Sequence, residues 1–494
     1  MILLAYILVA LVALAIIGLS TTHRCMNSAC IIHAFLYLVL TVYVLVFRQV
    51  PVASFFIGSQ YFFMDNFGLF EVLIASVIFT CAAVYAGGYV ESLLRSGELE
   101  KSSLKLFYTS WSMLLLVLVL AFFCDNLALF WICAELTTIL SAMLVAILSA
   151  RENIDAAIKY IFIASASMLF SFVGLIFLFE ASRRVLADGG TLNWTVLMQH
   201  ATVLPSGMLV AAFALVFIGF AAKSGIFPFH TWLPEAHAKA PSAVSAILSA
   251  VLLNVGIYGI IRVYAIVHQT PAAATMAPVL GLFGFFTVAI AAFSMLPQKN
   301  LKKLIAFSSV ENMGIILIGI AVSTPLALFW VLFHIMAHSL TKASLFFSAG
   351  ILHRQYRSRL STETVDEIWD VFRLQPLAAW GIIIGGLAIT GMPLFPIFFS
   401  KLFILLSLGT VSLPALFVLL FLLFVAGAAL GYFVITAFSQ VTAPGIPSDI
   451  EPYLTPLTMK IPLVFLICLI VLLGIMFTQG EISFLDRIVQ ELRF

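Results

Sequence analysis

The sequence has few charged residues. They make up 9% of its 494 residues, and hydrophobic residues make up 63%, whereas soluble domains carry about 25% charged residues. A chain this apolar lacks the polar residues needed to cover one core with a hydrated surface, so a soluble fold is excluded. The net charge is +2 and there is no basic run, so nothing indicates nucleic-acid binding. The composition is that of an integral membrane protein.

Motifs for metals and nucleotides are also absent from the sequence. The six cysteines form no CxxC pair and no cluster with histidine, so we expect them to be small apolar residues within helices. No glycine pattern of a Rossmann fold or a P-loop occurs. We therefore expect no metal and no cofactor in this chain, and we assign any redox chemistry to a partner subunit.

Apolar runs long enough to cross a bilayer occupy most of the chain. About 20 apolar residues are needed to cross. Runs of this kind lie near 2–20, 29–47, 67–90, 106–124, 126–149, 156–180, 206–226, 241–266, 277–296, 303–322, 325–350, 376–406, 412–438 and 458–478. We predict an all-α integral membrane protein with about 14 transmembrane helices.

The positions of lysine and arginine predict an orientation. If the N-terminus lies outside, most of these residues fall in inside loops, as the positive-inside rule requires. We therefore expect both termini outside. His23 and Arg24 follow the first apolar run instead of preceding it, which argues against a cleaved signal peptide. Three lysines remain within the predicted membrane spans: Lys223, Lys342 and Lys401.

Two of the predicted spans are interrupted by proline. The seventh runs into KSGIFPFHTWLPEAHAKAPSAV (223–244), and the twelfth contains ITGMPLFPIFFSKLF (389–403). An offset of five spans reverses direction through the membrane, and paired broken helices of opposite direction are typical of inverted-repeat transporters. We predict two inverted five-helix repeats with broken helices 7 and 12. The expected divisions are helices 1–3 (1–105), repeat 1 with helices 4–8 (106–267), repeat 2 with helices 9–13 (277–438), and helix 14 with the tail (439–494).

The intramembrane charges are the first candidates for function. A charge at the bilayer centre costs a few kcal/mol even on lenient scales. Desolvation favours the neutral form of a lysine and a nearby carboxylate favours the charged form, so a movable carboxylate can switch a lysine between holding and releasing a proton. We expect Glu135, in the fifth span, to face Lys223. The alternative is structural: paired or snorkelling lysines, and a glutamate hydrogen-bonded to serine or threonine.

The eleventh span carries a row of titratable residues. His334, His338 and Lys342 are spaced i, i+4 and i+8, which places them on one helix face. Imidazole titrates near neutrality, so we interpret the row as proton-carrying, with Lys401 extending it. A metal site is the less favoured alternative because lysine is a poor ligand at neutral pH. Polar contact between helices is another.

Further polar residues are candidates for a relay. Those near the first break could connect Lys223 to the inside water or cap helix ends. Glu311 could be a cap or a relay member, and Lys159 could form only a surface pair with Asp155. The candidates are His230, Glu235, His237, Asn254, Glu311 and Lys159.

At these residues the sequence resembles a known family. Residues 223–264 closely resemble the signature of the antiporter-like subunits found in respiratory complex I, Mrp-type cation/proton antiporters and membrane-bound NiFe hydrogenases. Three further stretches match it: ENIDAAIKYIFIAS, LKKLIAFSSVENMG and HSLTKASLFFSAG. A narrower likeness to the F component of hydrogenase-4, of the formate hydrogenlyase type, is carried by WICAELTTILSAMLV, SAVLLNVGIYGIIR and SSVENMG.

The resemblance implies roles for individual residues. Glu135 matches the family's fifth-helix glutamate and Lys223 its seventh-helix lysine. The row on the eleventh span matches the family's central polar row, and Lys401 matches the terminal residue at the broken twelfth helix. Two positions depart from the pattern. Asn254 stands where several complex I subunits have lysine, and Lys401 stands where the hydrogenlyase branch is expected to have glutamate.

We therefore expect a proton-translocating membrane subunit of a redox-driven complex, a hydrogenase, formate hydrogenlyase or complex I-like oxidoreductase. The chain itself would be non-catalytic, with Ni-Fe and iron–sulfur centres in partner subunits of the bacterial or archaeal inner membrane. Protons are the expected cargo, and sodium stays open. One alternative is a subunit of a cation/proton antiporter without a redox partner, or a transporter acting alone. A membrane scaffold without transport would tolerate neutral residues at 135, 223 and 401.

Overall fold

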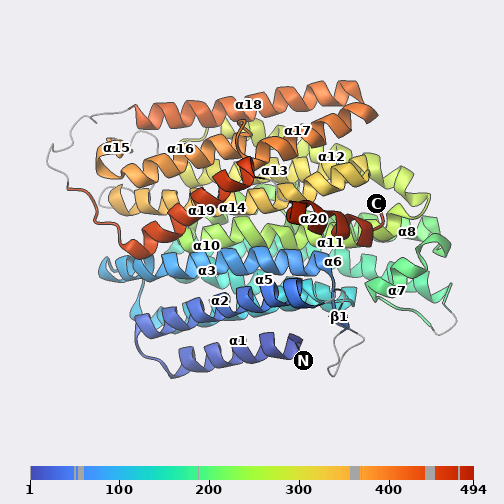
Figure 1. Ribbon diagram of the computed structural model, residues 1–494, viewed down its shortest axis with the longest axis horizontal. Helices are drawn as coiled ribbons and strands as arrows, with labels where there is room; N and C mark the ends of the chain where they lie inside the picture. Colours follow the sequence, from blue (N-terminus) through green and yellow to red (C-terminus); the bar gives the residue numbers. More distant parts are fainter. Residues whose placement is uncertain are drawn as a thin grey trace.

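The protein is a bundle of long helices that lie side by side. The computed structural model describes residues 2–48, 50, 52, 53, 61–148, 150–186, 189–356, 368, 370–439, 451–476 and 479–494. In this part of the chain, thirteen helices are long and apolar enough to cross a membrane. Figure 1 shows their axes roughly parallel. The all-α membrane fold predicted from the sequence is confirmed.

The helices of the first half begin at the N-terminus and end at the first break. They are α1 (Ile2–Leu19), α2 (His23–Phe47), α3 (Asn66–Arg95), η1 (Lys101–Ser103), α4 (Leu104–Phe122), α5 (Leu127–Val145), η2 (Ala146–Leu148), α6 (Arg151–Arg183), α7 (Trp194–Gln199), η3 (Ala201–Val203) and α8 (Ser206–Lys223). A two-residue antiparallel pair, β1 (Val52–Ala53) with β2 (Phe63–Met64), precedes α3.

The remaining elements run from the first break to the C-terminus. They are η4 (Phe229–Thr231), α9 (Trp232–Lys239), α10 (Ser242–Ile247), the π-helical turn η5 (Leu248–Leu252), α11 (Leu253–His268), α12 (Ala272–Met295), α13 (Leu301–Val322), α14 (Pro325–Tyr356), α15 (Val371–Leu374), α16 (Pro376–Thr390), α17 (Pro396–Val411), α18 (Leu413–Phe438), α19 (Leu457–Ile475) and α20 (Gln479–Glu491). The sequence analysis did not predict α7 or α20.

Both predicted interruptions are present. The helix α8 ends at Lys223, and Gly225 follows with a φ of +67°. In the second break, α16 ends at Thr390, Gly391 caps it with a φ of +84°, and α17 begins with Pro396. A left-handed glycine after a helix and a proline at the first helical position are common end and start signals. The halves α16 and α17 make up the twelfth span.

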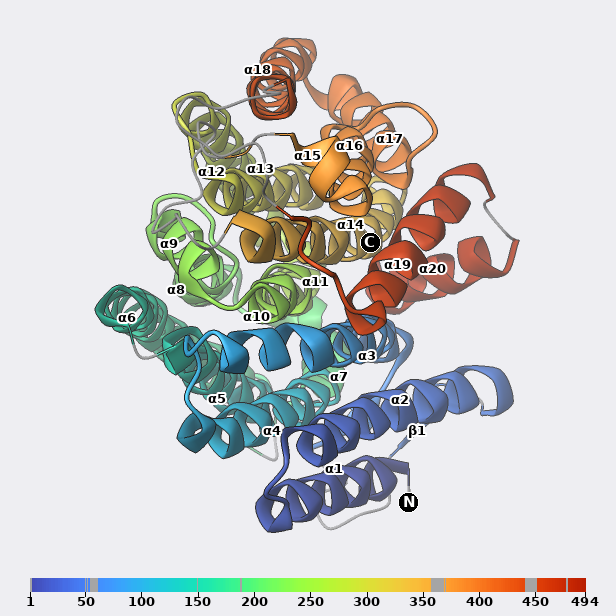
Figure 2. The same ribbon diagram turned by 90° about the vertical axis from the view of Figure 1, so that its left-hand side faces the viewer.

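The most buried spans lie at the centre of the bundle. In the continuous span α10–η5–α11, the most apolar window is 100% buried, whereas in α1 and in α18 only 28% is buried. The end-on view in Figure 2 shows α10 and α11 between α3 and α14, with α1, α6 and α18 at the periphery. Peripheral helices expose large apolar side chains such as Phe417 and Phe424, as expected of a surface against lipid. Polar groups on the central helices are therefore shielded from lipid.

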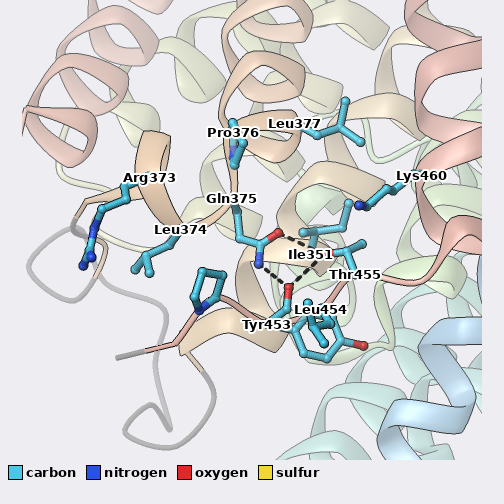
Figure 3. Close-up of a pocket in the computed structure, with 11 residues that line it drawn as sticks. Ile351, Arg373, Leu374, Gln375, Pro376, Leu377, Tyr453, Leu454, Thr455 and Lys460 are labelled. Atoms are coloured by element: carbon cyan, nitrogen blue, oxygen red, sulfur yellow. Dashed lines mark hydrogen bonds between the residues drawn. The ribbon is translucent and has the colours of Figure 1, made fainter. Parts of the chain in front are cut away.

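One end of the bundle, at the left in Figure 1, is closed by α15 and the segment before α19. The Nε2 of Gln375 donates to the carbonyl of Tyr453 at 2.7 Å and to Oε1 of Gln355 at 2.8 Å, and Thr455 donates to Oε1 of Gln375 at 2.9 Å. Gln375, Tyr453 and Thr455 border a cavity of about 300 Å³, shown in Figure 3. The glutamine thus ties α19 to α14 and α16. Residues 357–367, 369 and 440–450 of the neighbouring predicted loops lie outside the described residues.

The opposite end holds α20 and a buried ion pair. Arg262 and Asp65 lie 2.6 Å apart, and the guanidinium sits 4.4 Å from the ring centre of Trp194. The carboxylate of Glu491, on α20, accepts a hydrogen bond from the backbone N–H of Asn66 at 3.1 Å and a second from its side chain. The last helix is thereby fastened to the start of α3.

Candidate functional site

A first polar group surrounds Lys223 at the end of α8. The side chain is buried, with 1% exposure. Its Nζ donates to the carbonyl of Ala134 at 2.8 Å, to Oγ1 of Thr137 at 2.7 Å and to Oγ1 of Thr138 at 2.6 Å. All three acceptors belong to one turn of α5, and an ammonium has three protons to donate. Neutral oxygens therefore satisfy the buried lysine completely.

Glu135 lies on the same turn of α5 but makes a different contact. Its Oε2 accepts a hydrogen bond from Ser165 on α6 at 2.9 Å, and its buried Oε1 has no partner among the residues that the structure describes. No ion pair within 4.0 Å joins Glu135 to Lys223 in the described chain. The prediction that Glu135 faces Lys223 stays a prediction, and the two residues form no direct ion pair among the described contacts. The reason is that the Ala134 carbonyl and two threonine hydroxyls occupy all the donors of the ammonium.

A second polar group surrounds Lys401 beyond the other break. Its Nζ donates to Oε1 of Glu311 at 2.9 Å and to the carbonyl of Ile389 at 3.0 Å. Both charged side chains are buried. Carbonyls in the last turn of a helix have no partner within it and carry partial negative charge, so the end of α16 supplies an acceptor for the lysine. Sequence analysis left Glu311 open as a cap or relay member, and the structure places it in this ion pair.

A hydrogen-bonded network leads from this ion pair to the eleventh span. The Nδ2 of Asn312 donates to Oε2 of Glu311 at 2.5 Å, and its Oδ1 lies 3.0 Å from Nε2 of His334. The other ring nitrogen of His334 lies 2.8 Å from Oγ of Ser400. Asn312 thus links the ion pair to the first histidine of the row on α14.

The same network reaches Lys342. Its Nζ donates to the carbonyl of Ile305 at 2.7 Å and to Oγ of Ser308. The carbonyl of Ser308 in turn accepts from Nδ2 of Asn312 at 2.6 Å. Lys342 and Lys401 are therefore connected through α13. His338 lies between His334 and Lys342 in the row and is fully buried, yet neither of its ring nitrogens has a partner in the described ranges.

The candidates near the first break divide into two kinds. Lys159 and Glu235 form a solvent-accessible ion pair at 2.8 Å, so the lysine is in a surface pair, with Glu235 instead of Asp155. His230 and His237 are buried. The Nδ1 of His237 lies 2.8 Å from the carbonyl of Leu233, and its ring faces Phe346 on α14 at 5.4 Å between centroids. The second histidine thus lies against the central row.

Sequence reasoning missed three residues that the structure places in these polar groups. Ser308 and Asn312 share the stretch SSVENMG with Glu311, so a cluster of polar residues in one apolar span was the available signal. Glu71, in DNFGLFEVLIAS, is an acidic residue inside an apolar run, which is the signal that singled out Glu135. Its Oε2 accepts a hydrogen bond from Nδ2 of Asn254 at 3.1 Å.

Comparison with known families agrees with this architecture. The family model described as "NADH:quinone oxidoreductase/Mrp antiporter, TM" matches residues 124–431. The chain belongs to this antiporter-like family. The match covers both breaks and every predicted proton-carrying residue. The described residues contain no group of three or more histidine, cysteine, aspartate or glutamate side chains arranged to hold a metal ion.

Relatives of this antiporter-like chain come from several kinds of complex. It is 30% identical over 404 residues to the hydrogenase-4 component F homolog of Methylacidiphilum infernorum, covering 82% of this chain and 83% of that protein. It is 29% identical to hydrogenase-4 component B of Escherichia coli, covering 71% and 51%. It is 33% identical to an NAD(P)H-quinone oxidoreductase chain 4 of Synechococcus, covering 58% and 53%. The chain spans about half the length of the last two.

Two solved structures have the same fold. One is a chain of the archaeal membrane-bound sulfane sulfur reductase, with a TM-score of 0.85, 20% identity, and 99% and 96% of the two chains covered. The other belongs to the Mrp complex from Dietzia, with a TM-score of 0.83, 19% identity, and 99% and 98% covered. At this identity the likeness establishes the antiporter-like fold of the chain.

Proposed function

We propose that this chain is the proton-translocating membrane subunit of a redox-driven complex. The observation that carries the proposal is the buried network from Lys342 through Ser308, Asn312 and Glu311 to Lys401. Ionisable groups inside a membrane protein are costly and mark ion or proton pathways. Lys342 donates to the hydroxyl of Ser308, the backbone carbonyl of Ser308 accepts from Asn312, and Asn312 donates to Glu311, the partner of Lys401. These contacts bring the two lysines into one buried polar network across α13, α14 and α17. Membership in the antiporter-like family supports the same function.

In this proposal the polar group around Lys223 supplies protons to the route, and the polar group around Lys401 releases them. Lys223 is held by neutral acceptors, so it can release its proton without leaving a carboxylate unpaired in direct contact. The charge on Glu135, on the turn of α5 that carries the acceptors, biases Lys223 toward holding the proton. Protonation then passes along His334, His338 and Lys342 to Lys401. The driving reaction takes place in partner subunits.

The proposed division into repeats relates the two groups. Repeat 1 would span 106–267 and repeat 2 would span 277–438, after helices 1–3 (1–105) and before helix 14 with the tail (439–494). Lys223 and Lys401 then occupy corresponding spans, the seventh and twelfth, and Glu135 and Glu311 occupy the fifth and tenth. The matching breaks of α8 and of α16–α17 support this division, because broken helices in both halves are typical of inverted repeats.

The assembly we propose is of the hydrogenase or formate hydrogenlyase type. Two of the relatives are named as hydrogenase-4 components. Such a complex would carry Ni-Fe and iron–sulfur centres in partner subunits of a bacterial or archaeal inner membrane. The excess of lysine and arginine in loops at the α15 end supports placing that end inside and both termini outside.

The test is proton pumping by the purified complex in sealed vesicles. Lys223→Ala and Glu135→Ala should each abolish coupled pumping, while redox turnover partly survives because the redox centres lie in other subunits. Lys105→Ala is a matched control, since this exposed lysine only donates to the carbonyl of Gly18 at the bundle surface. Full pumping in both test variants would contradict the mechanism.

A second candidate is a subunit of a multi-subunit cation/proton antiporter with no redox partner. The fold shared with a chain of the Mrp complex supports this second candidate. Copurification from native membranes separates the two. Subunits with redox centres support the first proposal, and a set of antiporter subunits that exchange sodium for protons without an electron donor supports the second.

A further inference from the structure

Glu71 is a buried carboxyl group that none of the roles above includes. It lies on α3, outside both proposed repeats, and its exposed fraction is 0%. Within the described residues it has no cationic partner within 4.0 Å, whereas Glu311 has Lys401. Transfer of an unpaired carboxylate out of water is among the most costly burials in a protein. A carboxyl kept at such a place therefore needs a reason beyond packing.

The atoms around this carboxyl have a shortage of donors. Its Oε2 accepts from Nδ2 of Asn254 at 3.1 Å. Its Oε1 and the Oδ1 of Asn254 are both buried and have no partner among the residues that the structure describes. Buried polar atoms are almost always hydrogen-bonded, and two neighbouring acceptors without a donor are the setting that a proton relieves. A protonated Glu71 would supply that donor.

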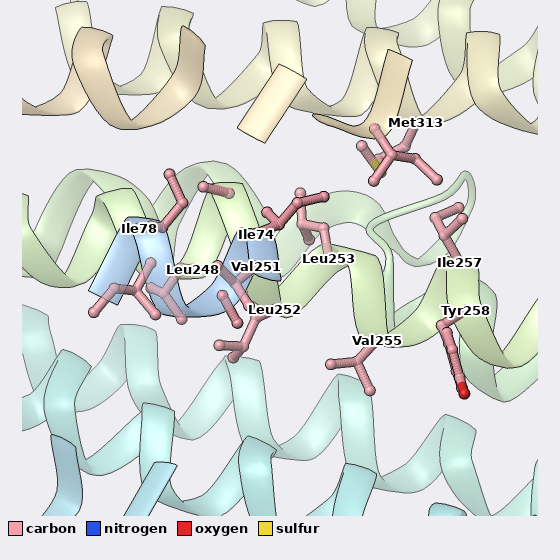
Figure 4. Close-up of a cluster of buried hydrophobic side chains, with 14 of the residues drawn as sticks. Ile74, Ile78, Leu248, Val251, Leu252, Leu253, Val255, Ile257, Tyr258 and Met313 are labelled. Atoms are coloured by element: carbon pink, nitrogen blue, oxygen red, sulfur yellow. The ribbon is translucent and has the colours of Figure 1, made fainter. Parts of the chain in front are cut away.

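The neighbouring turns of α3, η5 and α11 carry buried apolar side chains. Figure 4 shows Ile74 and Ile78 of α3 facing η5 and the start of α11, where Val251 and Leu253 lie. All four side chains are buried. A low-polarity setting of this kind favours the neutral form of a carboxyl group. The hydrogen bond from Asn254 favours the charged form, so the two influences oppose each other at one site.

Contacts also link the pair to the end of α8 on one side and to α14 on the other. Ser224, next to Lys223, donates to the carbonyl of Leu253, next to Asn254, at 3.0 Å. A Cβ on Gly256 would lie 2.1 Å from Oγ of Ser224, so only glycine permits this close approach of α8 and α11. On the other side, Nδ2 of Asn254 lies 3.3 Å from Oγ of Ser339. That serine directly follows His338, whose two ring nitrogens have no partner in the described chain.

The π-helical turn η5 ends directly before α11 and Asn254. Turns of this kind inside α-helices occur frequently at functional sites, because the wider turn offsets the helix and leaves backbone groups less regularly paired. It turns the span α10–η5–α11 at the level where α3, α11 and α14 meet. Three elements thus converge on the carboxyl of Glu71.

We propose that Glu71 is the proton-binding group that joins the two halves of the transport route. The carboxylate takes up one proton from the side of Lys223 and releases the same proton to the row on α14, with no other bond made or broken. Asn254 positions the carboxyl and is not itself protonated. The inference rests on the proposed function, and it adds a site contributed by α3, outside both repeats.

The first test uses Glu71→Gln in the intact complex. The amide keeps the size of the side chain and can accept from Asn254, but it binds no proton. We expect the complex to assemble and coupled pumping to fall to the level of Lys223→Ala, while Glu71→Asp restores part of it. Ser76→Ala is the control, since Ser76 is buried on α3 and its hydroxyl has no partner in the described chain. It should pump normally.

The second test needs no variant. Dicyclohexylcarbodiimide reacts with protonated carboxyl groups in apolar surroundings, and mass spectrometry of the α3 peptide locates the adduct. We expect labelling at Glu71 in the wild-type complex. Absence of the adduct, or full pumping in Glu71→Gln, overturns the inference. If Lys223→Ala stops pumping and Glu71→Gln does not, the inference alone fails. If neither substitution affects pumping, the proposed function fails.

Discussion

The two lysines beside the two helix breaks are held in different ways. Lys223 donates to a carbonyl and two threonine hydroxyls of α5, all of them neutral. Lys401 donates to a carbonyl at the end of α16 and to the carboxylate of Glu311. Both side chains are buried beside a proline-interrupted helix. The local architecture is thus similar in the two halves, and the balance of charge is not.

The difference shows what a helix break provides and what it does not. A break positions backbone carbonyls and lets a lysine be solvated by dipoles at membrane depth. Compensation by a full opposite charge depends on a side chain of another helix. Of these two lysines, Lys401 has a carboxylate within contact distance in the described chain, and Lys223 does not. Removal of the Lys223 charge leaves neutral oxygens, whereas removal of the Lys401 charge leaves Glu311 buried without its partner. We infer that the protein tolerates loss of the charge on Lys223 better than loss of the charge on Lys401.

The largest expected effect tests this difference directly. Lys401→Met should destabilise the protein by about 3–5 kcal/mol, because it leaves a buried carboxylate unpaired. The measurement is the thermal unfolding of the detergent-solubilised complex. The double substitution Lys401→Met with Glu311→Gln should recover part of the loss, since it removes both charges. Lys223→Met should cost less than Lys401→Met. An equal cost for the two single substitutions would break the comparison.

A smaller effect sharpens the account of the first half. Thr138→Val should destabilise the protein by about 1–3 kcal/mol, because it removes one neutral acceptor and leaves one proton of the Lys223 ammonium unpaired. Valine has nearly the same shape as threonine, so the packing around position 138 changes little. Thermal unfolding again gives the effect, and pumping should be slowed without being lost. Ser141 lies one turn further along α5 and contacts Tyr160 instead of the lysine, so Ser141→Ala is the control that should leave pumping unchanged.

The smallest expected effect concerns α20, which lies outside both halves. Its docking should depend on pH and serves as a reference for the other two predictions. Burial, together with the nearby charge of Asp65, raises the pKa of Glu491 from its ordinary value of 4.5 to about 7. The protonated form of Glu491 therefore stabilises the docking of α20. This stabilisation is fully present below pH 4.5 and is lost as the pH rises through about 7. Hydrogen exchange of the α20 amides between about pH 5 and about pH 8 should show this loosening.

The control for that effect is Glu491→Gln, which keeps a polar contact to Asn66 and has no proton to lose. Its α20 should exchange equally across the same range after correction for intrinsic rates. Pumping should be unaffected, because the helix lies at the end of the bundle away from Lys223 and Lys401. A persistent pH dependence in the variant would assign the titration to another group.

The sequence predicted the apolar spans and both breaks because these features depend on local composition. An apolar run either reaches the length needed to cross or does not. Prolines clustered with glycine and polar residues mark the two breaks, whereas the single prolines Pro278 and Pro462 lie inside α12 and α19 without ending them. The charges within the spans were predicted for the same reason: the buried Lys223, Lys342 and Lys401 and the half-buried Glu135 each stand out against an apolar run. The unusual cost of such residues makes them visible without any knowledge of their neighbours.

Contacts between helices could not be predicted in the same way. Glu135 was expected to face Lys223, but the sequence did not indicate that Thr137 and Thr138 on the same turn accept the hydrogen bonds of the lysine. Glu311 was left between two roles, and it pairs with Lys401 ninety residues further along the chain. Spacing within one helix indicates which residues share a face. It does not indicate which other helix that face meets, or how far two helices are rotated against each other.

By itself, the sequence determined that this chain is a multi-pass helical membrane protein with two interrupted spans and ionisable residues at membrane depth. Only the tertiary structure decided which of these residues are neutralised by a charge, which are held by dipoles, and that Glu71 of α3 meets Asn254 between the two halves. The physical reason is range. Hydrophobic transfer and helix termination act within a few residues of sequence, whereas ion pairs and hydrogen bonds across a bundle require helices far apart in the chain to pack within a few ångströms of one another.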